Sequence, residues 1–89
     1  MNNRTKEIEN FPNYKVCSNG YIYNIKTGRQ MTATKEGDGQ VRVELCNETG
    51  PHRLSVKRIV MDAFNESPMR RQIVHKDGDI LNNNYENLR

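Results

Sequence analysis

Cysteine is scarce in this 89-residue sequence, and tryptophan is absent. The two cysteines, Cys17 and Cys46, lie far apart in the chain and form no C-x-x-C pair. Paired cysteines are the usual ligands of a structural zinc ion, so we expect no zinc knuckle. Two isolated thiols also do not make a disulfide framework. We expect both to be reduced, which favours a cytoplasmic protein.

Long apolar runs are also missing. No stretch is long enough to span a membrane, and the polar segment 1–10 lacks the apolar core of a signal peptide. Hydrophobic residues make up 34% of the sequence, which is low for a globular domain. We therefore expect one small domain, or two very small modules that share a core, with a frayed N-terminus at residues 1–5.

No block of like charge stands out, although the net charge is +3. A mildly basic small protein is compatible with nucleic-acid binding, but this charge is not diagnostic of it. Any basic surface has to be assembled by folding. The alternative is an ordinary solvated surface with scattered lysines and arginines.

The first half of the chain alternates between apolar and polar residues, which is the pattern of half-buried strands. Segments 14–17 and 21–25 alternate on either side of Ser18-Asn19-Gly20, a tight-turn sequence, and predict a hairpin. A third, short strand is expected at 29–34 and a fourth at 40–46. Segment 52–54 is a candidate to pair back with the fourth strand.

A helix is expected over residues 55–64. Ser55 is a good N-cap residue, and Leu54 and Ile59 occupy the positions of a hydrophobic staple. Asn65 and Pro68 are expected to end the helix. Apolar residues recur at helical spacing and form one stripe that we expect to pack on the sheet; they are Val56, Ile59, Val60, Ala63 and Phe64.

The last part of the chain combines a short strand, expected at 72–75, with an asparagine-rich loop at 76–89. His75 ends the strand, and an imidazole can act as a general base near neutral pH. Asp77-Gly78 is a turn sequence, and the asparagines suit a loop held by hydrogen bonds from side chains to the backbone. The alternative for His75 is a loop histidine with only a structural hydrogen bond.

This stretch resembles the HNH motif of phage-type homing endonucleases, with the spacing H-x-D-G-x-x-x-N-N-x-x-x-N-L. The matching residues are His75, Asp77, Gly78, Asn82, Asn83, Asn87 and Leu88. Residues from about 6 to 46 resemble the nuclease-associated modular domain that precedes this motif, through the run 11–23 and Thr27-Gly28-Arg29. The resemblance implies a modular β-domain at 6–48 and a truncated HNH-like segment at 49–89.

Two departures from the family pattern concern the metal. The family usually places an aspartate, a metal ligand, directly before the histidine, and here that residue is Val74. The family's second ligand lies on a helix after the N-L-R segment, and this sequence ends at Arg89. His75 would then keep the general-base position as a relic. We expect no metal site, with Asp77 and Asp79 as weak candidates, and Mg²⁺ as cofactor only if the chain is a nuclease.

Basic side chains on the sheet, near the helix and ahead of the last strand are the candidate DNA contacts. The commoner role of any single one is a solvated charge. The family also carries a histidine where this chain has Lys57. The candidates are Lys15, Arg29, Lys35, Arg42, Lys57, Arg58, Arg70 and Arg71.

The expected fold class is α+β: a small antiparallel sheet with one amphipathic helix, followed by a truncated ββα (HNH-like) strand and loop. We expect an unpaired edge at 73–75, covered either by the tail or by another chain through strand addition or homodimerisation. The favoured function is a phage-encoded, catalytically defective protein in the host cytoplasm that binds DNA or a DNA-associated host protein. The alternatives are a metal-dependent nickase and a protein-directed inhibitor of a host defence or DNA-processing enzyme.

Overall fold

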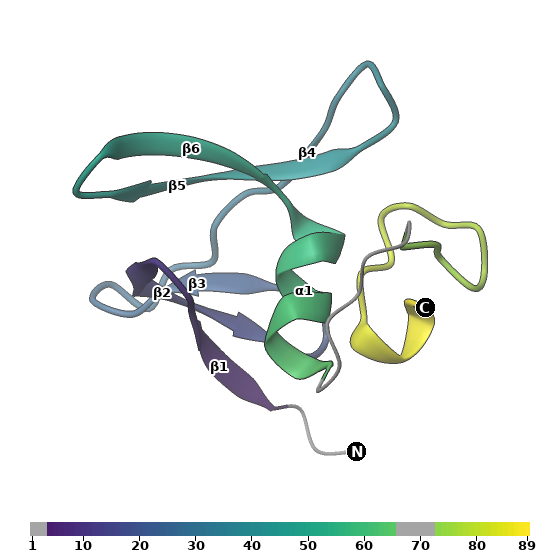
Figure 1. Cartoon of the computed structure of the whole chain (residues 1–89), viewed down its shortest axis with the longest axis horizontal. Helices are drawn as coiled ribbons and strands as arrows, with labels where there is room; N and C mark the ends of the chain where they lie inside the picture. The colour runs from purple at the N-terminus through teal and green to yellow at the C-terminus, as the bar shows by residue number, and fades with distance from the viewer. Residues whose placement is uncertain (1–3, 66–72) are drawn as a thin grey trace.

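The computed structural model describes residues 4–65 and 73–89. The fold is α+β, as expected, but it contains two small antiparallel sheets rather than one (Figure 1). The first sheet has the order β1 (Thr5–Ile8), β2 (Phe11–Cys17), β3 (Ile22–Asn24). The second has the order β4 (Thr34–Lys35), β5 (Val41–Asn47), β6 (Gly50–Ser55), followed by helix α1 (Val56–Phe64).

The predicted hairpin is β2–β3, in which Val16 pairs with Ile22 and Tyr14 with Asn24. Its turn closes with a hydrogen bond from the N–H of Gly20 to the carbonyl of Cys17 at 2.9 Å. Strand β1 was not predicted. Three of its four residues are exposed, so it carries no apolar alternation that a sequence pattern could reveal.

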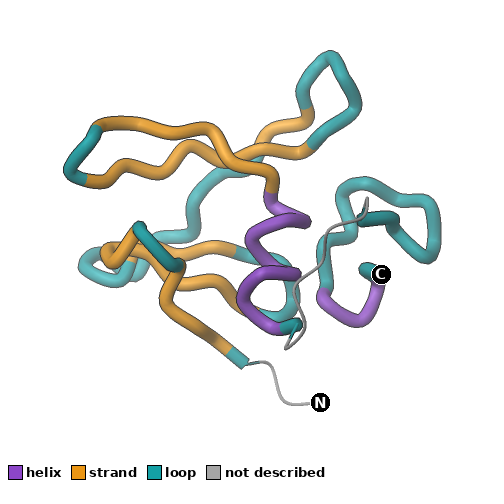
Figure 2. Tube along the Cα trace, viewed as in Figure 1, coloured by secondary structure: helices purple, strands orange, loops and turns teal. Residues whose placement is uncertain are grey.

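The prediction of one strand over residues 29–34 is wrong. Gln30 forms a single bridge with Tyr23 of the first sheet, whereas Thr34 and Lys35 form β4 and pair with β5 of the second sheet. This segment crosses from one sheet to the other, as the tube in Figure 2 shows, so no single set of ladder partners is available along its length. The candidate pairing of 52–54 is confirmed by the β5–β6 hairpin, which spans the boundary expected at 48/49.

Helix α1 begins one residue later than expected, at Val56, and ends at Phe64 as expected; its buried side chains pack between the sheets and the C-terminal segment. The prediction that the Ser55 side chain caps it is wrong. Ser55 is the N-cap residue, but its hydroxyl makes no capping bond and is buried without a partner among the described residues. At the other end the N–H of Asn65 donates to the carbonyl of Met61; Pro68 lies outside the described residues.

The core joins both sheets to the helix. Val16, Leu45 and Val60, one from each of these three elements, are completely buried. Polar and aromatic contacts also join the sheets away from the helix: the hydroxyl of Tyr14 accepts from the N–H of Cys46 at 3.3 Å, and His52 lies edge-on to Phe11. Cys17 is buried and Cys46 exposed, both as free thiols. No helix in the described ranges is long and apolar enough to cross a membrane.

The C-terminal segment folds back on itself beside α1 (Figure 1). The N–H of Val74 donates to the carbonyl of Arg89 at 2.9 Å, and the N–H of Arg89 donates to the carbonyl of Val74 at 3.1 Å. His75 forms a bridge with Leu88, and residues 85–87 form a short 3₁₀ helix, η1 (Tyr85–Asn87). The tail thus covers the edge at 73–75, which confirms one of the two coverings considered. The strand expected at 72–75 is wrong for the described residues 73–75, because their only ladder contact is the single bridge at His75.

Candidate functional site

His75 is half-buried and is held by one side-chain hydrogen bond. Its Nε2 lies 2.8 Å from Oδ1 of Asn83, an amide that is only 6% exposed. Because a carbonyl oxygen can only accept, the Nε2–H of His75 donates this bond. The bond therefore places a proton on Nε2, and in the neutral ring Nδ1 is then the acceptor that a general base requires.

Asp77 is the centre of the asparagine-rich loop. Its carboxylate accepts from the N–H of Asp79 at 2.8 Å and from the side-chain amides of Asn82 and Asn87, both at 2.9 Å. These donors, the Asp79 N–H above all, lower the pKa of Asp77 from 3.8 to about 2. The loop is thus held by side-chain hydrogen bonds, as predicted, and both oxygens of Asp77 have donors.

The fit of a divalent cation to these residues is poor. Val74, which takes the position of the family's ligand, is 42% exposed and offers no donor atom. A cation at Asp77 would have to displace the amides of Asn82 and Asn87, and Asp79 uses Oδ1 to accept from the N–H of Leu81 at 3.0 Å. Among the described residues, no group of three or more histidine, cysteine, aspartate or glutamate side chains could hold a metal ion.

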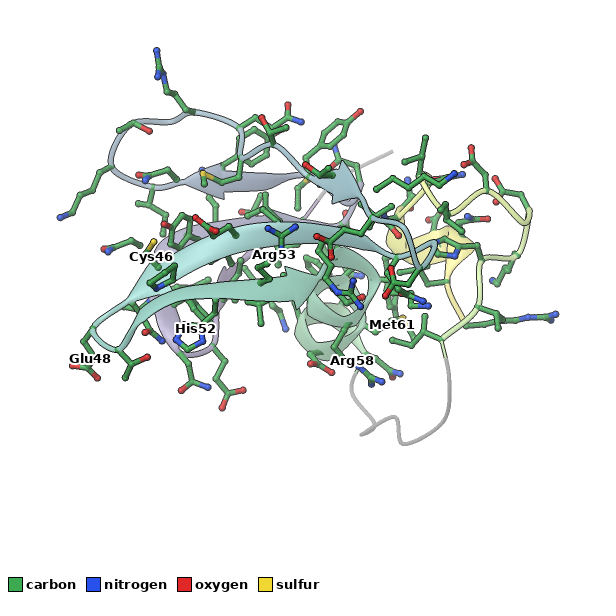
Figure 3. The ribbon with its side chains drawn as sticks, turned by 90° about the horizontal axis from the view of Figure 1, so that it is seen from above. Cys46, Glu48, His52, Arg53, Arg58 and Met61 are labelled. Atoms are coloured by element: carbon green, nitrogen blue, oxygen red, sulfur yellow. The ribbon has the colours of Figure 1, made fainter. Side chains whose placement is uncertain are left out.

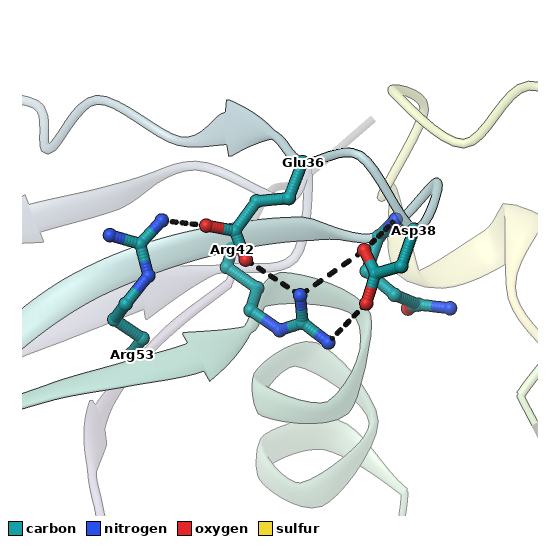
Figure 4. A network of polar contacts seen from close by, with 5 residues as sticks. Glu36, Asp38, Arg42 and Arg53 are labelled. Atoms are coloured by element: carbon teal, nitrogen blue, oxygen red, sulfur yellow. Dashed lines mark hydrogen bonds and ion pairs between the residues drawn. The ribbon is translucent and has the colours of Figure 1, made fainter.

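Arg42 is engaged within the second sheet (Figure 4). Its guanidinium contacts Glu36 at 2.6 Å and Asp38 at 2.9 Å, and Glu36 also pairs with Arg53 of β6. The hydrogen bond from Arg42, followed by the N–H of Gln40, holds the pKa of Asp38 below its usual range. The positive charge of Arg42 is therefore offset by neighbouring carboxylates.

The four basic candidates on and after α1 differ in their surroundings. Lys57 is half-buried and donates from Nζ to the carbonyl of Ile73 at 3.2 Å, which joins the helix to the C-terminal segment. Arg58 is exposed on the helix (Figure 3). Arg70 and Arg71 lie outside the described residues.

Three basic candidates remain on or between the sheets. Lys15 of β2 pairs with Tyr23 of β3, and Tyr23 in turn forms the bridge with Gln30, the residue after Arg29. Arg29 therefore lies beside this row but not in it, and both Arg29 and Lys35 are exposed. The structure places Lys15 on the first sheet, Arg29 next to that sheet and Lys35 on the second sheet.

Sequence reasoning missed two features next to the motif. The guanidinium of Arg4, the residue before β1, lies 5.1 Å from the ring centre of Phe64 and 5.8 Å from that of Tyr85, so it contacts both the helix and η1. Asn83 was identified only as a motif position, yet it holds His75. An isolated arginine and one asparagine among three give no pattern that distinguishes them.

No family model matches the sequence. Two proteins of Acanthamoeba polyphaga mimivirus, both described as uncharacterized HNH endonucleases, are similar to it. L247 is 28% identical over 85 residues, which cover 93% of this chain and 21% of L247. L245 is 33% identical over 89 residues, which cover 99% of this chain and 27% of L245. This chain therefore spans less than a third of the length of either relative.

A solved structure concerned with DNA binding and cleavage by the HNH homing endonuclease I-HmuI is similar to this chain in fold. The TM-score is 0.85 at 30% sequence identity, and the match covers 96% of this chain and 50% of the I-HmuI chain. Because the match covers 96% of this chain, it includes both sheets, the helix and the C-terminal segment. On these similarities, together with the motif from His75 to Leu88, the chain is an HNH endonuclease-like protein.

Proposed function

We propose that this chain is a DNA-binding module of the homing-endonuclease type that binds double-stranded DNA and does not cut it on its own. The observation that carries the proposal is Val74, an apolar side chain at the position of a metal ligand, beside a loop whose aspartates hold the loop itself. The DNA-binding part is supported by the likeness to I-HmuI over nearly all of this chain.

Hydrolysis of a phosphodiester by an HNH site requires a base and a divalent cation that stabilises the leaving oxygen. His75 occupies the base position, and its neutral ring would offer Nδ1 as the acceptor. The described residues lack the ligand set for the cation. We propose that the described residues keep the frame of the site without a ligand set for the cation that would drive cleavage.

Lys15, Arg29 and Lys35 are the phosphate contacts that we propose. Their side chains are not among the ion pairs of the described residues, whereas Arg42 and Arg53 pair with Glu36 and Asp38. A charge already offset by a carboxylate releases fewer counterions when it approaches DNA, so it contributes less to affinity. The electrostatic contribution then comes from Lys15 on the first sheet, from Arg29 beside that sheet and from Lys35 on β4 of the second sheet.

The test uses supercoiled plasmid and the 89-residue chain, with and without Mg²⁺ or Mn²⁺. We expect a mobility shift that weakens steeply as salt rises, and no nicked product in either metal. Metal-dependent nicking that is lost in His75→Ala would instead establish a nickase. The absence of both a shift and nicking would overturn the DNA-binding proposal and favour a protein target.

The nickase remains the second candidate because of one observation. The Asn83 bond orients the His75 ring with Nε2–H toward Oδ1 and leaves Nδ1 on the other side of the ring, an arrangement that DNA binding alone does not require. A nickase would need a cation held by residues other than Val74. The plasmid experiment distinguishes the two functions directly.

A further inference from the structure

The turn between β2 and β3 is in direct backbone contact with Asn83. Gly20, the last residue of this turn, is buried and has a φ of +97°. A Cβ atom at this position would lie 2.7 Å from both the carbonyl carbon and the carbonyl oxygen of Asn83. The backbone of Asn83 therefore occupies the space that any side chain at position 20 would need, and it cannot yield as the end of a flexible side chain could.

The same turn fixes the C-terminal segment at a second point. The carbonyl of Ser18 accepts a hydrogen bond from the N–H of Tyr85 at 2.7 Å. Tyr85 lies two residues after Asn83, so the turn holds both ends of the segment 83–85. The position of the Asn83 backbone is therefore set by the first sheet.

Asn83 transmits this position to His75. The residue is 6% exposed, so its amide has little freedom to reach another partner, and Oδ1 accepts from Nε2 of His75 at 2.8 Å. The backbone around His75 is anchored separately, through Val74 with Arg89 and through the N–H of Lys76, which donates to the carbonyl of Asn87 at 2.7 Å. What Asn83 adds is the orientation and the proton position of the imidazole ring.

We infer that the Ser18–Gly20 turn and Asn83 are positioning residues for His75. The strand that leads into the turn, β2, also carries Lys15, the proposed phosphate contact. Orientation of the imidazole is thereby coupled to the sheet that meets DNA. The inference rests on the proposed function for what His75 does at DNA, but its test observes the imidazole and requires no DNA.

The experiment compares Gly20→Ala with Gly39→Ala by long-range ¹⁵N–¹H spectra of the imidazoles. Gly39 is a matched control, because its φ is +81° and a Cβ there meets nothing within 4 Å. Both variants carry the cost of a positive φ, and only Gly20→Ala adds the clash. His52 is the internal reference, since its Nε2 lies 2.7 Å from the hydroxyl of Thr49 on the hairpin remote from the C-terminal segment (Figures 1 and 3).

In the unaltered chain and in Gly39→Ala we expect His75 to give one signal set, that of the Nε2-protonated ring. In Gly20→Ala and in Asn83→Ala that single form is lost to a mixture of tautomers, while the His52 signals do not change. A purely structural role for the turn would leave the His75 signals of folded Gly20→Ala unchanged, and that result would overturn the inference. Equal changes in Gly39→Ala would overturn it as well.

If Gly20→Ala does not fold, the unaltered chain provides the second measurement. Nuclear Overhauser contacts from the α-protons of Gly20 to Asn83, and from the Asn83 side chain to the His75 ring, are expected together. Their presence, with the tautomer mixture in Asn83→Ala, supports the positioning role. The absence of either contact overturns it, whatever the outcome of the DNA experiment.

Discussion

Asp77 and Asn87 exchange hydrogen bonds in both directions across the C-terminal loop. The side-chain amide of Asn87 donates to Oδ1 of Asp77 at 2.9 Å, and the N–H of Asp77 donates to Oδ1 of Asn87 at 3.2 Å. Asn87 also donates to the carbonyl of Asn82 at 2.8 Å. One asparagine side chain thus closes the loop that follows His75.

Replacing Asn87 should therefore loosen this loop. In Asn87→Ala three hydrogen bonds are lost together, and we expect the free energy of unfolding to fall by about 1–3 kcal/mol. Urea denaturation followed by circular dichroism measures it. Asn13→Ala, at an exposed asparagine of β2, is the control and should change stability by less than about 0.5 kcal/mol. Equal stability of the two variants would mean that the loop contributes nothing to folding.

The loop should also respond to acid. The pKa of Asp77 is lowered from 3.8 to about 2, so the ionised form stabilises the folded loop. A lowered folded-state pKa means that this contribution is present above pH 3.8 and is lost as the pH falls toward 2. Amide chemical shifts of Asp79 and Asn82, followed from neutral pH to acid, should move in that window. The change of these two amide shifts between pH 3.8 and 2 should be absent in Asp77→Asn and present in Asp62→Asn.

The proposed DNA contacts can be tested through salt dependence. Lys15→Ala and Arg29→Ala should each weaken binding and lower the slope of log K against log salt by about 0.9, the value for one phosphate contact. The double variant Arg42→Gln with Asp38→Asn keeps the net charge and removes an internal ion pair, so its slope should match that of the unaltered chain. A lower slope in the double variant would show that Arg42 contacts DNA.

Position 74 can be given the missing carboxylate. Val74→Asp places an oxygen donor directly before His75, and we expect weak Mn²⁺ binding, with a Kd on the order of 10⁻³ M, because one carboxylate does not complete a site. Electron paramagnetic resonance of free Mn²⁺ measures the bound fraction. Val74→Thr has a similar shape without the charge and should bind no metal. Equal binding by the unaltered chain would identify a site elsewhere, with Asp77 and Asp79 as the first candidates.

The helix, the β2–β3 hairpin and strand β5 were predictable from the sequence because their apolar residues recur at the period of the element, whereas β6 (Gly50–Ser55) has no such pattern and its pairing was only a candidate. Strand β1 was not, since Ile8 is its only buried residue and its pairing with β2 is made by the backbone. The segment at 29–34 was misread because local alternation does not say which sheet a residue joins. Tertiary pairing determines that Gln30 joins the first sheet and that Thr34 and Lys35 join the second.

The candidate site could be predicted only in part from the sequence. His75, Asp77 and Asn87 were found through their spacing, but spacing does not specify which atom binds which. The contact between Gly20 and Asn83 joins residues that are distant in the sequence. The sequence alone does not distinguish a glycine required only by its turn from one that also leaves room for the backbone of another segment. The carboxylates that engage Arg42 lie in a loop whose shape the pattern does not define.

Every ladder in both sheets joins strands that are consecutive in the chain. Such meanders close short loops and lose little entropy in doing so, which favours rapid formation of each sheet. The C-terminal segment instead depends on contacts between distant residues, from Ser18 to Tyr85 and from Lys57 to Ile73. We therefore expect it to dock after the two sheets during folding, which would make the docking of His75 dependent on sheets that are already formed.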